Sequence, residues 1–243
     1  MCVLAFAFQP NSRWQLVVAG NRDESHARPS LPLARWEEHP HLLAGRDAVA
    51  RGTWMGVSEE GRFAVVTNVG GEGPPDPDLE SRGALVVDLL MGRHSGIDAA
   101  EADRFNAFNV ITANRDGANF FANRPAFQHR PLEPGIYGLS NADLDAPWPK
   151  TVRLRSGVEE WLAGGAGEAA ALLCLLADGR ETPLESLAEP HLSPIFMRNP
   201  AYGTRCSTVV LVDAKGQGRI IERSYSPEAD ITGEVELEFR WPA

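Results

Sequence analysis

The sequence predicts an α+β fold built on antiparallel sheets. Short apolar runs separated by turn-forming residues occur along most of the chain, which is typical of strands joined as hairpins. A block of helical periodicity interrupts them before the last strands, and this order of elements favours the α+β class. Because no repeat or linker divides the 243 residues, we expect a single domain spanning residues 1–243.

The first hairpin organises the rest of the prediction. Residues 3–8 and 14–19 are apolar and are joined by the turn-forming residues 10–13. A hairpin returns the end of its second strand to the start of its first. We therefore expect the segment Asn21-Arg22-Asp23 to lie beside Cys2.

The remaining elements follow in order. Residues 25–50 are rich in proline and charge, have little periodicity, and are expected to form a long connection. Asp116-Gly117 between two apolar runs is a strong hairpin signal. Strands are predicted at residues 53–57, 62–67, 108–112, 118–122, 135–139, 208–212, 219–222 and 235–241, and helices at residues 81–91, 97–104, 149–162 and 168–177.

Composition and charge exclude several classes of protein. The net charge of −10 argues against nucleic acid or an anionic membrane as the main partner. No apolar run reaches 18 residues, so no integral membrane segment is expected. The beginning of the sequence lacks the basic region of a signal peptide, and we expect a cytoplasmic protein.

The three cysteines form no disulfide pattern. An odd and sparse set of cysteines favours a reducing compartment. Cys174 lies in an apolar helical run and Cys206 in a predicted strand, and free cysteines are among the most buried residues. We therefore expect both to be buried structural thiols.

Cys2 is different, because removal of Met1 would leave its thiol and a free α-amine on one residue. Such an amine has a pKa of roughly 7.7–8.0 and can accept the thiol proton near neutral pH. Asp23 is a candidate to hold this amine, and Arg22 to lower the thiol pKa. The alternative for both is an exposed ion pair at a strand end. Because neighbours in a strand face opposite sides, both reach Cys2 only if the strand ends by Arg22.

The ordered motifs of this chain resemble those of the NRDE family, also named the transport-and-Golgi-organisation type 2 family. That family resembles cysteine N-terminal-nucleophile hydrolases of the penicillin V acylase and bile salt hydrolase type. The resemblance implies an αββα sandwich, in which two antiparallel sheets lie between helix layers. The motifs are Cys2, Asn21-Arg22-Asp23-Glu24, Ala44-Gly45-Arg46-Asp47, Gly52-Thr53-Trp54, Val66-Thr67-Asn68, Tyr137-Gly138-Leu139-Ser140-Asn141, Pro147-Trp148-Pro149-Lys150 and Tyr202-Gly203-Thr204-Arg205.

The resemblance also implies roles for three later residues. Asn68 and Asn141 correspond to paired asparagines whose side-chain amides stabilise an oxyanion. Arg205 corresponds to a late arginine that faces the thiol. Each residue has an ordinary alternative, which is a turn cap for either asparagine and a carboxylate partner elsewhere for the arginine.

The substrate pocket is predicted less directly. Asn21 and Trp54 are candidates for substrate binding, although an aromatic residue is often simply part of the core. Arg46-Asp47 could be a surface pair or a pocket wall, and the structural interpretation is preferred. The six histidines have no helical i, i+4 pair and no zinc spacing, so no metal or cofactor is expected.

These observations leave two main hypotheses of different classes. The first is a hydrolase that cleaves an amide or thioester bond in a small acyl substrate through Cys2. The second is a carrier of haem or an acyl lipid without turnover, since members of the resembled family have been linked to lipid metabolism and haem handling. A purely scaffolding role is a third possibility, and the oligomeric state is left open.

Overall fold

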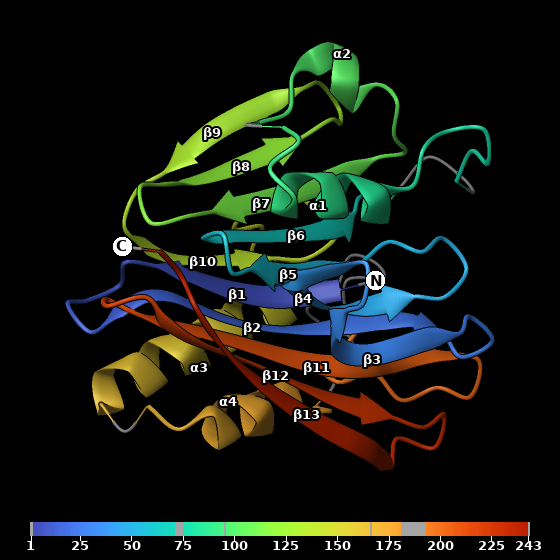
Figure 1. Ribbon diagram of the computed structural model, residues 1–243. Coiled ribbons are helices and arrows are strands. Elements are labelled where there is room, and N and C mark those ends of the chain that lie inside the picture. The colour runs from blue at the N-terminus through green and yellow to red at the C-terminus, as the bar shows by residue number, and fades with distance from the viewer. Residues whose placement is uncertain (1, 71–74, 95, 166, 181–192, 243) are drawn as a thin grey trace.

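The computed structural model describes residues 2–70, 75–94, 96–165, 167–180 and 193–242, and it contains two stacked antiparallel sheets (Figure 1). The six-stranded sheet has the order β10 (Gly135–Leu139), β1 (Cys2–Phe8), β2 (Trp14–Ser25), β11 (Tyr202–Asp213), β12 (Gln217–Tyr225) and β13 (Ile231–Arg240). The seven-stranded sheet has the order β3 (Ser30–Trp36), β4 (His39–Asp47), β5 (Met55–Ser58), β6 (Arg62–Asn68), β7 (Phe108–Ala113), β8 (Ala118–Ala122) and β9 (Gln128–Leu132).

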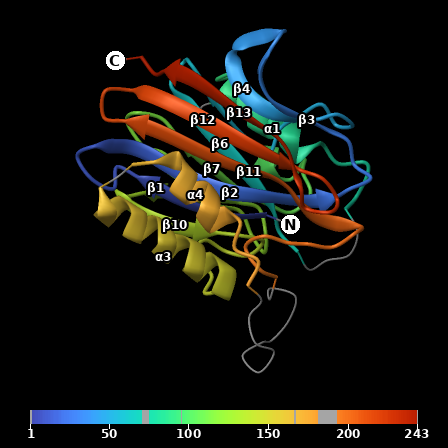
Figure 2. The same cartoon turned by 90° about the horizontal axis from the view of Figure 1, so that it is seen from below.

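Helices cover the outer faces of both sheets. The helices α3 (Pro149–Gly164) and α4 (Ala169–Leu176) lie across the six-stranded sheet (Figure 2), and α1 (Arg82–Leu90) packs on β5 and β6. A short helix, α2 (Ala99–Ala102), follows α1. This arrangement confirms the αββα sandwich. Within the described ranges, no helix combines the length and apolar character needed to cross a membrane.

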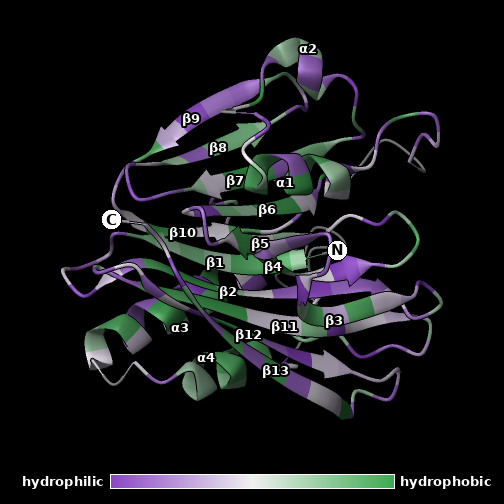
Figure 3. Cartoon of the chain, in the orientation of Figure 1, coloured by the Kyte–Doolittle hydropathy of each residue, from purple (hydrophilic) through white to green (hydrophobic). Residues whose placement is uncertain are grey.

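Strand β1 is buried on both faces. Leu4 and Phe6 belong to the core between the sheets, whereas Val3 and Ala5 belong to the core beneath α3 and α4. Alternate residues of a strand point to opposite faces, so burial of both faces requires a continuous apolar run. Figure 3 shows β1 largely hydrophobic and the outer strand β9 largely hydrophilic.

The prediction of a long connection at residues 25–50 is wrong, because β3 and β4 occupy most of it. Strand β3 is an edge strand, and most of its side chains are exposed. It therefore lacks the apolar alternation from which a strand is recognised. An edge strand also tolerates a proline such as Pro32. The opposite edge strand, β9, contains Pro131 and was missed for the same reason.

The three cysteines are free, and their burial differs from the prediction at one position. Cys206 is buried as expected, but Cys174 is exposed. The buried side of α4 is formed by Leu172, Leu173 and Leu176, and Cys174 lies off that side. An apolar helical run that covers a sheet needs only one buried face, so its small residues can face solvent.

Candidate active site

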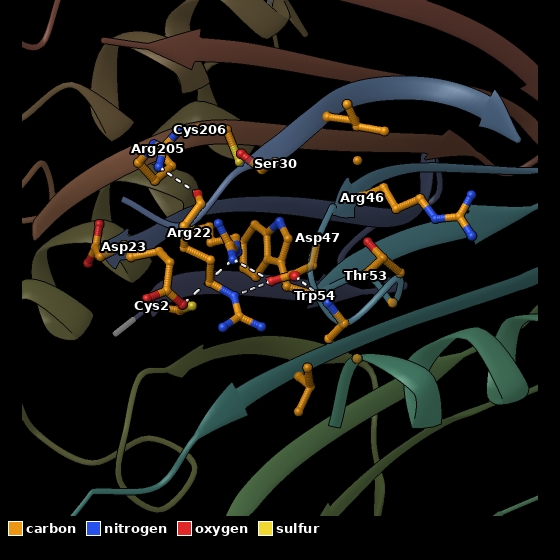
Figure 4. Close-up of a pocket in the computed structure, with 18 of the residues that line it drawn as sticks. Cys2, Arg22, Asp23, Ser30, Arg46, Asp47, Thr53, Trp54, Arg205 and Cys206 are labelled. Atoms are coloured by element: carbon orange, nitrogen blue, oxygen red, sulfur yellow. Dashed lines mark hydrogen bonds and ion pairs between the residues drawn. The ribbon is translucent and has the colours of Figure 1, made fainter. Parts of the chain in front are cut away.

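A cavity of about 750 Å³ is lined by residues of both sheets and of the start of α1. Strands β1, β2, β11, β12 and β13 contribute from the six-stranded sheet, and β3, β4 and β6 from the seven-stranded sheet. Six of the eight predicted site residues line it, namely Cys2, Arg22, Asp23, Trp54, Asn68 and Arg205. Figure 4 labels all of these except Asn68.

Cys2 and Arg22 face the cavity together because the hairpin register pairs them directly. Cys2 is the cross-strand partner of Arg22 in β2, and Arg22 is in turn the partner of Cys206 in β11. Directly paired residues in a sheet point to the same face. These three paired residues therefore present a thiol, a guanidinium and a second thiol to the cavity.

Asn21 lies on the opposite face of the same sheet and does not line the cavity. Its side chain is fully buried and donates to the carbonyl oxygens of Leu176 and Ile195, both at 2.8 Å. Its amide oxygen accepts a hydrogen bond from Ser207 at 2.7 Å. Asn21 thus ties the helix layer to the sheet, and its contact with substrate stays a prediction.

Asp23 lines the cavity although strand β2 continues past it, which the sequence did not predict. Strand β2 does not end at Arg22 but continues to Ser25, so Asp23 leaves the strand on the side opposite to Arg22. The register of β11 against β2 shifts between Thr204 and Cys206, which is a β-bulge at Arg205. Thr204 lies opposite Asp23 and donates its hydroxyl to the carboxylate at 2.7 Å.

Burial determines the protonation of both Cys2 and Asp23. Asp23 is 2% exposed, and burial raises its pKa to about 6, although the hydrogen bond from Thr204 opposes the shift. Burial also raises the pKa of the Cys2 thiol, and the nearby Asp23 carboxylate acts in the same direction. The positive charges of the chain's N-terminus and of Arg22 oppose this rise in the pKa. At rest, the sulfur is therefore a neutral thiol at neutral pH.

The end of β10 holds the backbone of Cys2. The Cys2 nitrogen donates to the Asn141 side-chain oxygen at 3.2 Å, and the Ser140 hydroxyl donates to the Cys2 carbonyl at 2.7 Å. The amide nitrogen of Asn141 donates to the carbonyl oxygen of Asn68 at 2.7 Å. Asn141 is 8% exposed, and it contacts Cys2 through its side-chain oxygen. The side chain of Asn68, in contrast, is exposed and borders the cavity.

Two arginines converge on Asp47 across the cavity. The Asp47 carboxylate accepts from Arg28 at 2.5 Å and from Arg22 at 3.2 Å (Figure 4), so β2 and β4 are joined by charge. Burial acts to raise the pKa of Asp47, but the hydrogen bonds from Arg28 and from the backbone of Ala50 and Val49 outweigh it and lower the pKa. Asp47 therefore stays a carboxylate at neutral pH.

Arg205 supports the rim of the cavity through backbone contacts. One of its terminal nitrogens donates to the carbonyl oxygens of Ser25, His26 and Arg28, at 3.0, 3.2 and 3.0 Å. These carbonyls belong to the turn between β2 and β3. The guanidinium is thus directed at this turn, and its Nε is a buried atom for which the described part of the chain supplies no hydrogen-bond partner.

Sequence reasoning missed several residues of the cavity. Arg28 was not among the candidates, and Asp47 was considered only within the pair Arg46-Asp47. The contact between them depends on the fold, which brings the turn after β2 next to the end of β4. Arg82 begins α1, donates to the Ala107 carbonyl at 2.9 Å, and has a pKa lowered by burial. Apolar periodicity placed this helix correctly, but it carries no information on which charged residue enters a cavity. Among the described residues, no three His, Cys, Asp or Glu side chains gather as a metal site would require.

The fold matches solved structures of acylases. A Caenorhabditis elegans ortholog of N-acylethanolamine-hydrolyzing acid amidase aligns with a TM-score of 0.54 at 12% identity, covering 86% of this chain and 92% of that chain. Penicillin V acylase from Agrobacterium tumefaciens aligns with a TM-score of 0.53 at 14% identity, covering 92% of this chain and 83% of that chain. The class is therefore the N-terminal-nucleophile hydrolase-like fold, and identities this low establish the fold alone.

The sequence comparison defines the family within that class. The family model described as Transport and Golgi organisation 2 matches residues 1–227. A mouse Transport and Golgi organization 2 homolog is 31% identical over 257 aligned positions, covering 92% of this chain and 93% of the relative. The human homolog is 32% identical over 261 positions with the same coverage. The chain belongs to the Transport and Golgi organisation 2 family.

Proposed function

We propose that this protein is a hydrolase in which Cys2, freed of Met1, attacks the amide or thioester bond of a small acyl substrate. The observation that carries the proposal is the environment of Cys2. Its thiol faces the cavity in register with Arg22, while its nitrogen is held by Asn141. The names of the structural neighbours, which include an amidase, a penicillin acylase and a conjugated bile acid hydrolase, agree with this reaction type.

The reaction divides into acylation and deacylation. The α-amine of Cys2 takes the thiol proton as the sulfur bonds to the substrate carbonyl carbon, and the carbonyl becomes an oxyanion. Collapse of this intermediate breaks the bond to the leaving amine or thiol, which receives the proton. Water then attacks the thioester on Cys2, releasing the carboxylic acid and restoring the thiol.

A base on the same residue suits a thiol that is neutral at rest. Because burial raises the pKa of the Cys2 thiol, few molecules carry a thiolate before substrate binds. An adjacent amine can accept the proton during the attack itself. The hydrogen bond from the Cys2 nitrogen to Asn141 supports a role for Asn141 in orienting that amine.

The remaining polar residues have separate roles in the proposal. Asn68 borders the cavity with an exposed amide, which suits it to donate to the oxyanion. Asp23 holds the charged form of the amine, and Arg22 lowers the cost of the thiolate by its proximity. Arg205 maintains the turn that forms the rim, and Trp54, 9% exposed, supplies an apolar wall for the acyl chain.

The test is turnover with matched cysteine variants. Protein lacking Met1 is incubated with a panel of N-acyl amides and acyl thioesters, and the released carboxylic acid is quantified. We expect Cys2→Ala to lower kcat by ~10³-fold or more. The exposed Cys174 offers the control, since Cys174→Ala removes a thiol that does not line the cavity. Full turnover by Cys2→Ala on a hydrolysed substrate would reject the proposal.

The carrier hypothesis has one observation in its favour. The cavity volume of about 750 Å³ lies in the range of roughly 300–1,000 Å³ that small-molecule pockets occupy. A carrier of haem or an acyl lipid predicts stoichiometric binding that is unchanged in Cys2→Ala and leaves the ligand intact. Calorimetric titration of both proteins, followed by mass analysis of the recovered ligand, separates carriage from hydrolysis.

A further inference from the structure

Lys150 is an unusual residue in this chain. The sequence contains 23 lysine and arginine residues, and all but two of them, Lys150 and Lys215, are arginines. Lys215 is exposed, whereas Lys150 is 0% exposed. Burying an ammonium is costly unless other groups compensate its charge. The burial of Lys150 therefore calls for a specific interaction.

The position of Lys150 in its helix adds to that cost. It lies in the first turn of α3, directly after Pro149. The positive end of a helix dipole disfavours a cation there. Within the described ranges, the ammonium contacts the Ser193 hydroxyl, to which Nζ donates at 2.8 Å, and the Trp148 ring, whose centre lies 5.7 Å away. A hydroxyl and an aromatic ring only partly compensate a buried charge.

The start of α3 is held close to the strand end that binds Cys2. A Cβ added at Gly138 in β10 would collide with Thr151, the residue after Lys150. The glycine thus allows the first turn of α3 to approach β10, two residues before Ser140. Ser140 and Asn141 are the residues that hold the backbone of Cys2.

Asp23 and Cys2 are the ionisable groups whose charges act on Lys150. Burial lowers the pKa of Lys150, and the negative charges of Asp23 and of the Cys2 thiolate oppose that shift. Asp23 is itself acted on by the chain's N-terminus, by Lys150 from α3 and by Arg22 from its own strand.

Contacts along residues 193–197 place the lysine and the aspartate in the same region. Lys150 donates to Ser193 at 2.8 Å. Four residues later the Met197 nitrogen donates to the Thr204 hydroxyl at 2.9 Å, and that hydroxyl donates to the Asp23 carboxylate at 2.7 Å. The lysine and the aspartate are thus two buried groups near each other, whose opposite charges stabilise each other.

We propose that Lys150 is a positioning residue for the proposed chemistry, whose buried ammonium keeps Asp23 ionised so that Asp23 can hold the N-terminal amine beside the Cys2 thiol. This inference rests on the proposed function. Loss of the ammonium leaves Asp23 buried with less positive charge around it, so Asp23 takes up a proton at a higher pH. The neutral acid then no longer stabilises the ammonium that forms when the amine accepts the thiol proton.

The first experiment measures the mutual stabilisation without any substrate. Because the chain has two lysines, protein labelled with ¹³C at the lysine ε-carbon gives two resonances, and the exposed Lys215 serves as internal reference. We expect Asp23→Asn to lower the titration midpoint of Lys150 by about one pH unit. The Lys215 midpoint stays unchanged. Equal Lys150 midpoints in the two proteins would overturn the proposal.

The second experiment connects the lysine to the chemistry. Acylation of Cys2 by a chromogenic thioester is followed from pH 4.5 to 8.5 in wild type, Lys150→Met, Lys150→Arg and the control Lys215→Met. We expect the acidic limb of the profile to move up by about one pH unit in Lys150→Met. It stays in place in Lys215→Met, and Lys150→Arg restores it in part because the charge is retained.

The outcomes separate the two proposals. An unshifted acidic limb in a folded Lys150→Met protein, checked by circular dichroism, would contradict the positioning role. If Lys150→Met does not fold, the lysine titration in wild type and Asp23→Asn decides the question alone. Coupled titration without acylation of any variant would contradict the hydrolase and support the electrostatic link between Lys150 and Asp23.

Discussion

Replacement of Asp23 by asparagine is expected to stabilise the protein at neutral pH. Asp23 is 2% exposed and its pKa is raised to about 6, so the folded state disfavours the carboxylate. Asparagine has the same shape, is neutral at every pH, and keeps an oxygen that can accept the 2.7 Å hydrogen bond from Thr204. The variant therefore removes the buried charge with little change in packing.

The magnitude follows from proton linkage. The folded pKa of about 6 lies above the ordinary value of 3.8, so between these values the native state binds more protons than the unfolded state. Stability then falls as pH rises through this window. At pH 7 the full effect is present, and a shift of about two units corresponds to about 3 kcal/mol. Below pH 4 the two proteins are expected to have equal stability.

Urea unfolding of wild type and Asp23→Asn at pH 4, 5.5 and 7 measures this difference. We expect a growing excess of the free energy of unfolding in the variant, which reaches about 3 kcal/mol at pH 7, or a rise in Tm of about 6–12 °C. Over the same pH range, acylation of Cys2 is expected to fall in the variant. A variant that is less stable at pH 7, or a difference independent of pH, would refute the reasoning.

Three further substitutions test the packing around the site. Gly52→Ala should lower the free energy of unfolding in urea by about 3 kcal/mol, because the new Cβ would collide with the backbone of Gly83 in α1. A variant of wild-type stability would contradict this contact. Asn21→Ala should cost ~3 kcal/mol, because it removes the donor to the buried Leu176 and Ile195 carbonyls and leaves the Ser207 hydroxyl with only its contact to Tyr225. KM should stay unchanged, so a KM effect without loss of stability would show that Asn21 contacts substrate. Arg205→Met should lower Tm by about 2–4 °C and increase hydrogen exchange at the turn of residues 25–28, and unchanged exchange there would exclude its role at the rim.

The parts of the fold with strong periodicity were predictable from the sequence. The continuous apolar run of β1 and its turn fixed the first hairpin, and the hairpin register then brought Arg22 opposite Cys2. The edge strands β3 and β9 could not be predicted in this way, since their side chains are largely exposed and their prolines resemble loop residues. A strand is recognised in the sequence by its apolar residues, and these occur only where the strand is buried.

The sequence predicted which residues form the candidate site better than it predicted how their side chains are arranged. The alternation of a strand already separates Asn21 from Arg22, and the structure follows it by turning Asn21 toward the helices. Asp23 approaches Cys2 opposite a bulge in β11, a strand that lies about 180 residues later and whose register the sequence does not reveal. The burial of Lys150 was also hidden, because a lysine after Pro149 resembles any solvated residue at a helix start.

The most direct test of the central claim is the mass of the N-terminal peptide after brief exposure to an acyl thioester. The account predicts a peptide that begins at Cys2, lacks Met1 and carries one acyl group, while the peptide containing the exposed Cys174 is unmodified. The adduct should decay as free carboxylic acid appears. A peptide that retains Met1, or a free Cys2 alongside an acylated Cys174, would contradict the account.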